Sequence, residues 1–152
     1  MAVYFLLVSI VIGGAETDNK GYGGFCFRPD AERKPFTFTA PNGVLEKDTL
    51  ELAQPWVDVT FSTEKGGAKV SGAAIFQHPG NPREYPYPGW ITRAYGFLGC
   101  SWPHTRPFEL PAGDSFRLRY RLLLHRGVAA DADIAGQFDA YFKACKSEGD
   151  AQ

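Results

Sequence analysis

The chain has 152 residues, of which 44% are hydrophobic and 22% charged, and these values fit one globular domain of ordinary size. Its 12 Phe, 7 Tyr and 3 Trp residues argue against a disordered chain, because disordered segments are poor in aromatic residues. The net charge is -1, so the chain lacks the basic excess that binds the phosphate backbone of nucleic acids. We therefore expect a single domain over residues 1–152 that does not bind nucleic acid.

The first residues, MAVYFLLVSIVI, form an apolar stretch that is too short for a helix that spans a membrane. Residues 3–12 could form a strand buried on both faces, since they are rich in β-branched and aromatic residues and no Lys or Arg precedes them. Residues 1–15 could instead be a signal peptide that ends at the small residues Gly13, Gly14 and Ala15. The strand predicts a cytoplasmic protein and the signal peptide an exported one, and neither predicts insertion into a membrane.

Short apolar or alternating stretches, separated by turn signals, predict a series of strands. In chain order these strands cover residues 22–28, 35–40, 49–52, 56–64, 68–77, 90–98 and 115–126. The turn Glu64–Gly67 would pair the two strands that flank it in antiparallel fashion. In strand 56–64, Trp56 and Asp58 would face opposite to Val57 and Val59.

Only residues 129–146 have helical spacing, and Asp131 or Asp133 could cap the start of this helix. One side of the helix would carry its apolar residues, Ile134, Phe138, Phe142 and Cys145. Many short strands with a single terminal helix predict an all-β fold. We expect an antiparallel β-sandwich, of the jelly-roll or sugar-binding type, with one C-terminal α-helix.

The segment from His78 to Trp90 contains four prolines and several polar and aromatic side chains. Prolines restrict the backbone, so such a loop loses little entropy when it binds a ligand. Hydrogen-bonding groups next to flat aromatic rings suit a sugar. The ligand-binding candidates in this segment are Asn81, Arg83, Tyr87 and Trp90, and His78 is the candidate catalytic residue. The alternative is a structural loop that covers the edge of the sandwich.

The last predicted strand, residues 115–126, carries Arg117, Arg119 and Arg121 on one face, and His125 extends the same face. Arginines bind carboxylates and phosphates through paired hydrogen bonds, so this row suits an acidic sugar or a similar anion. Arg119, Arg121 and His125 are therefore added to the ligand-binding candidates. The alternative is an ordinary solvated face of a half-exposed sheet.

Neither a metal site nor a familiar catalytic motif is evident in the sequence. The three cysteines lie far apart with no C-x-x-C pair, and Cys26 and Cys100 stand in apolar runs typical of buried thiols. His78, His104 and His125 lack metal-ligand spacing, so no metal or cofactor is predicted, although a fold that brings histidines together would reopen that alternative. Asp58, Glu64 and Glu84 are candidate acid/base carboxylates whose separation the sequence does not define.

Two motifs resemble a family of bacterial domains known as PmoA-like, often labelled methane oxygenase PmoA. One is IFQHPGNPR (Ile75–Arg83), with Trp90 after it, and the other is LRYRLLLHRG (Leu118–Gly127). The upstream segments GYGGFCFRP and PWVDVTF also fit, so the resemblance covers most of the chain from Gly13 onward and corresponds to the C-terminal half of the family domain.

The resemblance implies a β-sandwich similar to sugar-binding sandwiches, from proteins connected with polysaccharide utilisation. It also implies an apolar strand before the GYGG segment, which favours the strand interpretation of residues 3–12. The methane label is not carried over, because a membrane subunit of a methane monooxygenase needs several transmembrane helices. Family members usually have an N-terminal half with a His-rich motif that this sequence lacks, so a second half-domain or another copy of the chain is a candidate partner.

These observations lead to a main hypothesis in which the domain binds a carbohydrate or a similar small polar ligand at the loop 78–90. A second hypothesis is a carbohydrate-active enzyme in which His78 acts as general acid/base, with or without a metal. A third is a truncated domain with a structural or accessory role.

Overall fold

The computed structural model describes residues 21–149. Both interpretations of the N-terminus, a strand over residues 3–12 and a signal peptide over residues 1–15, concern residues outside this range. Among the described residues, no helix is long and apolar enough to cross a membrane.

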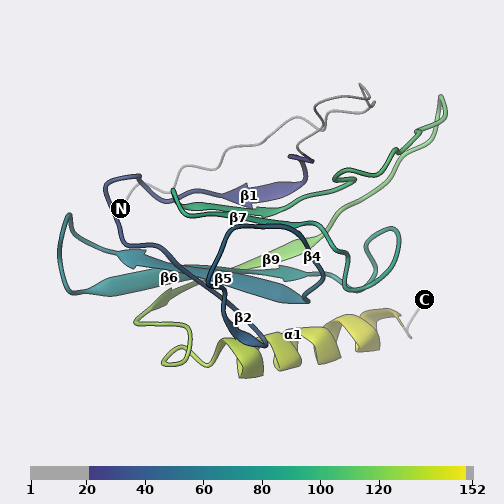
Figure 1. Ribbon diagram of the computed structural model, residues 1–152. Coiled ribbons are helices and arrows are strands. Elements are labelled where there is room, and N and C mark those ends of the chain that lie inside the picture. The colour runs from purple at the N-terminus through teal and green to yellow at the C-terminus, as the bar shows by residue number, and fades with distance from the viewer. Residues whose placement is uncertain (1–20, 150–152) are drawn as a thin grey trace.

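Residues 21–149 form two antiparallel sheets and one helix (Figure 1). The four-stranded sheet has the order β1 (Phe25–Phe27), β8 (Phe97–Cys100), β7 (Trp90–Arg93), β4 (Thr49–Leu52). The five-stranded sheet has the order β3 (Gly43–Val44), β2 (Thr37–Ala40), β5 (Trp56–Ser62), β6 (Val70–Gln77), β9 (Tyr120–Arg126). Helix α1 (Ile134–Gly149) lies on the outer face of the five-stranded sheet (Figure 1). The predicted all-β sandwich with one C-terminal helix is confirmed.

Strand β5 is buried on both faces, because one face meets the second sheet and the other meets the helix. Val57 and Val59 pack in the core between the sheets together with Ile75, Trp90 and Leu98. Trp56 packs on the other side with Phe76 of β6 and with Phe138 and Tyr141 of α1. The alternation predicted for this strand is confirmed, and so is its antiparallel pairing with β6.

The helix begins at Ile134, and Asp133 caps it by accepting a 3.2 Å hydrogen bond from the N–H of Gly136. Ile134, Phe138 and Cys145 face the sheet as predicted. Phe142 is only partly buried, whereas Tyr141, which the spacing analysis omitted, is 7% exposed. The sheet-facing side of α1 is therefore rotated toward Tyr141 relative to the prediction.

Most of the predicted strands are shorter in the structure, and the helix predicted from residue 129 begins at Ile134. The last two predicted strands change the most. Residues 90–98 were predicted as one strand but form a hairpin of β7 and β8, with a turn closed by a 2.8 Å hydrogen bond from the N–H of Gly96 to the carbonyl of Arg93. Gly96 has a φ of 94°, which L-residues with a side chain rarely adopt. The strand predicted from residue 115 begins only at Tyr120. Arg117 and Arg119 therefore precede the strand, and of the predicted row Arg121 alone lies in β9. Arg119 stays beside the end of β6 because its backbone is hydrogen-bonded to His78 and Asn81.

Candidate functional site

The loop between β6 and β7 is held to the fold by its own side chains. The amide of Gln77 clamps the backbone of Tyr87, with hydrogen bonds of 2.9 Å to its carbonyl and 2.8 Å from its N–H. The hydroxyl of Tyr87 donates a 2.7 Å hydrogen bond to the carbonyl of Pro103 in the next loop. Burial raises the pKa of Tyr87, so this hydroxyl stays protonated as a donor at neutral pH.

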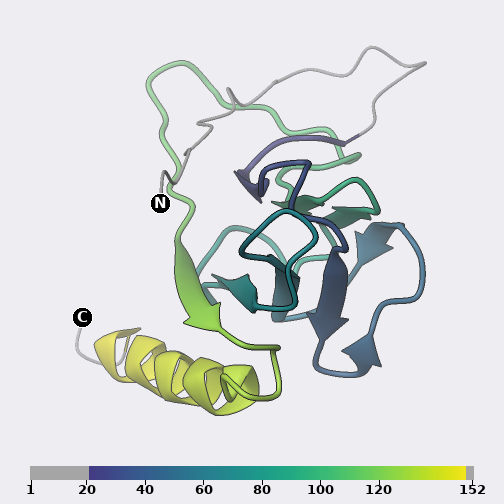
Figure 2. The same cartoon turned by 90° about the vertical axis from the view of Figure 1, so that its left-hand side faces the viewer.

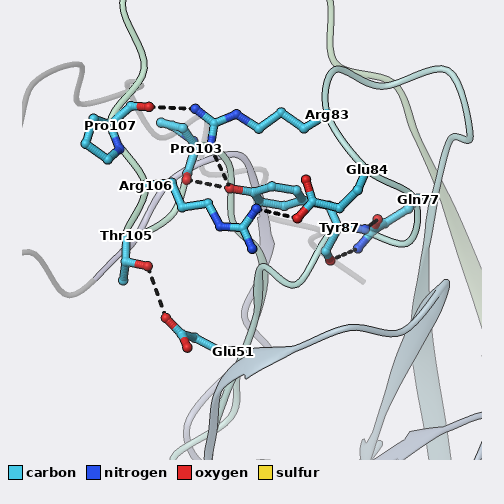
Figure 3. A network of polar contacts seen from close by, with 9 residues as sticks. All are labelled: Glu51, Gln77, Arg83, Glu84, Tyr87, Pro103, Thr105, Arg106 and Pro107. Carbon is cyan, nitrogen blue, oxygen red and sulfur yellow. Dashed lines mark hydrogen bonds and ion pairs between the residues drawn. The ribbon is translucent and has the colours of Figure 1, made fainter.

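Arg83 also joins the two loops. Its guanidinium donates a 2.6 Å hydrogen bond to the carbonyl of Pro107 and lies 5.6 Å from the ring of Trp102. Glu84 pairs with Arg106, whose guanidinium lies over the ring of Tyr87. Figure 3 shows the Tyr87 ring between the two guanidinium groups. These contacts favour the structural interpretation of the loop at Arg83 and Tyr87.

Trp90 and Asn81 are likewise engaged in the fold. Trp90 is 0% exposed, and its indole Nε1 donates a 2.6 Å hydrogen bond to the carbonyl of Gln54. The side chain of Asn81 bonds the backbone of Arg119 twice, at 2.9 Å to its carbonyl and at 2.7 Å from its N–H. Asn81 therefore continues the pairing of β6 with β9 beyond the ends of both strands. We leave Arg83, Tyr87, Trp90 and Asn81 out of the ligand contacts proposed below.

His78, Arg119 and Arg121 lie together at the end of β6 and β9 and are called the basic site from here on. Arg121 is opposite Phe76 in the register of the two strands, and a 3.3 Å hydrogen bond joins the N–H of His78 to the carbonyl of Arg119 just beyond. Since residues two apart share a face of a sheet, all three side chains lie on the α1 side. Gly80 lies close to both the Arg119 guanidinium and the His78 ring. A Cβ at this position would be 3.0 Å from Arg119 Nη2 and 3.2 Å from His78 Nδ1, so a residue with a side chain would be crowded there.

Tyr141 of α1 contacts two residues of the basic site. The guanidinium of Arg121 lies 4.6 Å from the ring centre of Tyr141, and the ring of His78 meets the same ring edge-on at 6.1 Å. Burial is the main cause that raises the pKa of Tyr141, so its hydroxyl is uncharged at neutral pH. Both arginines are exposed, and among residues 21–149 neither of them forms an ion pair with a carboxylate. Two exposed guanidinium groups beside an imidazole can bind an anion.

Tyr141 is the contributor to this site that sequence analysis missed. Its spacing of three from Phe138 and four from Cys145 was the available signal, because residues at these offsets share a helix face. The structure adds what the spacing could not show, namely that this face meets the end of β6 and β9.

His125, the remaining candidate, is separated from the basic site by its burial. Its Nε2 lies 2.8 Å from Oδ1 of Asp58, and the hydroxyl of Thr60 donates a 3.1 Å hydrogen bond to the other carboxylate oxygen. The His125 side chain is 6% exposed and that of Asp58 0%. Gly72 of β6 lies between the two strands, and a Cβ at this position would collide with the His125 ring. This pair connects β9 to β5 across β6.

We expect the stability of the protein to fall above about pH 4 because of Asp58, whose pKa is raised chiefly by burial. A raised pKa means that the folded state binds this proton more tightly than the unfolded state. The contribution of Asp58 to stability is then complete below the ordinary pKa of an aspartate and is lost as the pH rises through the folded-state value. Asp58→Asn keeps an acceptor for His125 but cannot ionise.

The measurement is the free energy of unfolding by urea for wild type and Asp58→Asn between about pH 3 and pH 7. Wild type should lose stability relative to the variant as the pH rises. The same comparison in a His125→Gln background tests whether the slope remains when the imidazole partner is absent. A difference that is independent of pH in both backgrounds would contradict the prediction.

The described residues contain no group of three or more His, Cys, Asp or Glu side chains placed to hold a metal ion. Cys26, Cys100 and Cys145 are free thiols in the structure. Cys100 is buried as predicted, whereas Cys26 is half-buried, and burial raises its pKa to about 11. Reactivity requires the thiolate, so Cys26 is a poor nucleophile at neutral pH.

Comparisons with known proteins give one match. Residues 8–139 match the model of a family of unknown function, DUF6807. No curated protein and no solved structure matches the chain. Because the family model covers most of the 152 residues, the chain belongs to the DUF6807 family.

Proposed function

We propose that the protein binds a carbohydrate with an acidic group, or a similar small polar anion, at the basic site formed by His78, Arg119 and Arg121. The observation that carries this proposal is the pair of exposed arginines beside His78, neither of which has a carboxylate partner among the described residues. Each guanidinium can donate two parallel hydrogen bonds to a carboxylate.

Part of the site is positioned before a ligand arrives, which supports the proposal. Asn81 fixes the backbone of Arg119, and the Tyr141 ring supports the guanidinium of Arg121. Groups that are already ordered lose little conformational entropy on binding. The resemblance of the motifs Ile75–Arg83 and Leu118–Gly127 to PmoA-like domains, which we include in the proposal, points to the same ligand class.

Arg119→Gln and Arg121→Gln are each expected to weaken binding of an acidic glycan by about tenfold or more, since a charge-assisted hydrogen bond contributes about 1.5–3 kcal/mol. A glycan array with uronate-containing and neutral glycans identifies the ligand, and isothermal titration calorimetry gives the affinities. His78→Ala should weaken binding by a smaller factor. Arg126→Gln is the matched control, because Arg126 is an exposed arginine at the far end of the same strand.

Binding of no glycan on the array, or equal affinities for wild type and both arginine variants, would count against the proposal. Incubation of bound glycans with the protein tests the enzyme alternative in the same experiment. Release of product that is lost in His78→Ala would replace the binding function by a catalytic one.

A further inference from the structure

A groove of about 550 Å³ lies on the same side of the five-stranded sheet, and it shares no residue with the basic site. It is formed where the first two turns of α1 and the loop before them pass the end of β2 and the start of β5. Figure 2 shows the helix lying along this side of the sheet. The volume is within the usual range for small-molecule sites, about 300–1,000 Å³.

The walls of the groove are apolar, with Trp56, Ile134 and Phe138 as the largest contributors. Trp56 is 5% exposed, and its indole N–H forms no hydrogen bond with any residue in the described range 21–149. This N–H is not among the fully buried polar atoms that lack a partner, so it is open to water and can donate a hydrogen bond to a ligand that replaces that water. The groove therefore has an aromatic wall with one hydrogen-bond donor, the indole N–H of Trp56.

The charge of the groove is opposite to that of the basic site. Asp133 and Asp139 line it, and no Lys, Arg or His does. One carboxylate oxygen of Asp133 accepts the hydrogen bond that caps the helix. Asp139 is exposed and has no ion-pair partner among the residues that the structure describes. Two carboxylates repel an anion and attract a cation, and the faces of Trp and Phe rings attract cations as well.

We propose that this groove binds a small organic cation with an apolar body, such as a protonated primary amine that carries an aromatic or aliphatic group. The apolar part lies in the groove against the exposed edges of Trp56, Ile134 and Phe138, and the ammonium group lies at the rim beside Asp139. The inference does not depend on the proposed function of the basic site, since the two surfaces have separate residues and opposite charge.

The test uses three probes of similar shape and different charge: 2-phenylethylammonium, 2-phenylethanol and phenylacetate. Binding is followed by NMR through the indole N–H signals, which the 3 tryptophans supply and which single Trp→Phe variants assign. The ammonium probe should shift the Trp56 signal and bind about three- to fivefold more tightly than the alcohol, as expected for a partly exposed charge contact of up to about 1 kcal/mol. Phenylacetate should bind more weakly than both.

Asp139→Asn should remove the preference for the ammonium probe over the alcohol and leave the affinity for the alcohol unchanged. Asp114→Asn is the control, because Asp114 is also exposed but lies in a separate turn outside the groove. Equal binding of all three probes, or shifts that leave the Trp56 signal unmoved, would overturn the inference. A preference for the ammonium probe that persists in Asp139→Asn would also overturn it.

Discussion

Replacing Asp58 by alanine is expected to lower the free energy of unfolding by about 3 kcal/mol, because two buried partners lose their acceptor at once and each orphaned group costs about 1–3 kcal/mol. Those partners are Nε2 of His125, at 2.8 Å, and the hydroxyl of Thr60, at 3.1 Å. Both side chains are nearly buried on the face of the five-stranded sheet that meets α1, so little water can replace the carboxylate. Chemical denaturation by urea at neutral pH measures the change.

Asp58→Asn is the control for this variant, since it keeps the shape and one acceptor and should cost less than the alanine. A double-mutant cycle with His125→Gln isolates the contribution of the pair itself. If Asp58→Ala and Asp58→Asn were equally stable, the two hydrogen bonds would not be the source of the effect. The pair matters for the basic site as well, because it fixes β9, the strand that carries Arg121, to β5.

The fold was predictable where local patterns agree with burial. The alternation in Trp56–Ser62 and the spacing of Ile134 and Phe138 are direct consequences of the faces that these elements bury. The hairpin over residues 90–100 was not predictable in this way. Residues typical of strands stand on both sides of its turn, and Gly96 is the one residue that marks the turn. The start of the last strand at Tyr120 was missed because residues 115–119 continue its alternation, whereas the strand register with β6 ends at Tyr120.

The candidate site was predictable at the level of residues but not of contacts. His78, Arg119 and Arg121 were chosen for their chemistry, and the structure brings them together through the pairing of β6 with β9. The pairing of His125 with Asp58 depends on the register of three strands and on Gly72, which has no side chain and leaves room for the His125 ring. Neither condition can be deduced from the spacing of residues in the sequence. An aromatic ring suits a ligand and a core equally well, so Trp90 could not be assigned from residue type alone.

Trp90→Ala is expected to lower the free energy of unfolding by about 4 kcal/mol if Trp90 is a core residue and not a ligand contact. The usual cost of truncating a buried tryptophan is about 3–5 kcal/mol. The side chain is 0% exposed, packs between the sheets with Val57 and Leu98, and donates its indole N–H to the carbonyl of Gln54. The loss is a large part of the total for a domain, about 5–15 kcal/mol. Trp90→Phe fills most of the space and should cost less than the alanine. If Trp90 acts only through the core, Trp90→Phe will bind acidic glycans with the affinity of wild type, and its urea midpoint will fall. A loss of affinity without a loss of stability would instead show that Trp90 contacts the ligand.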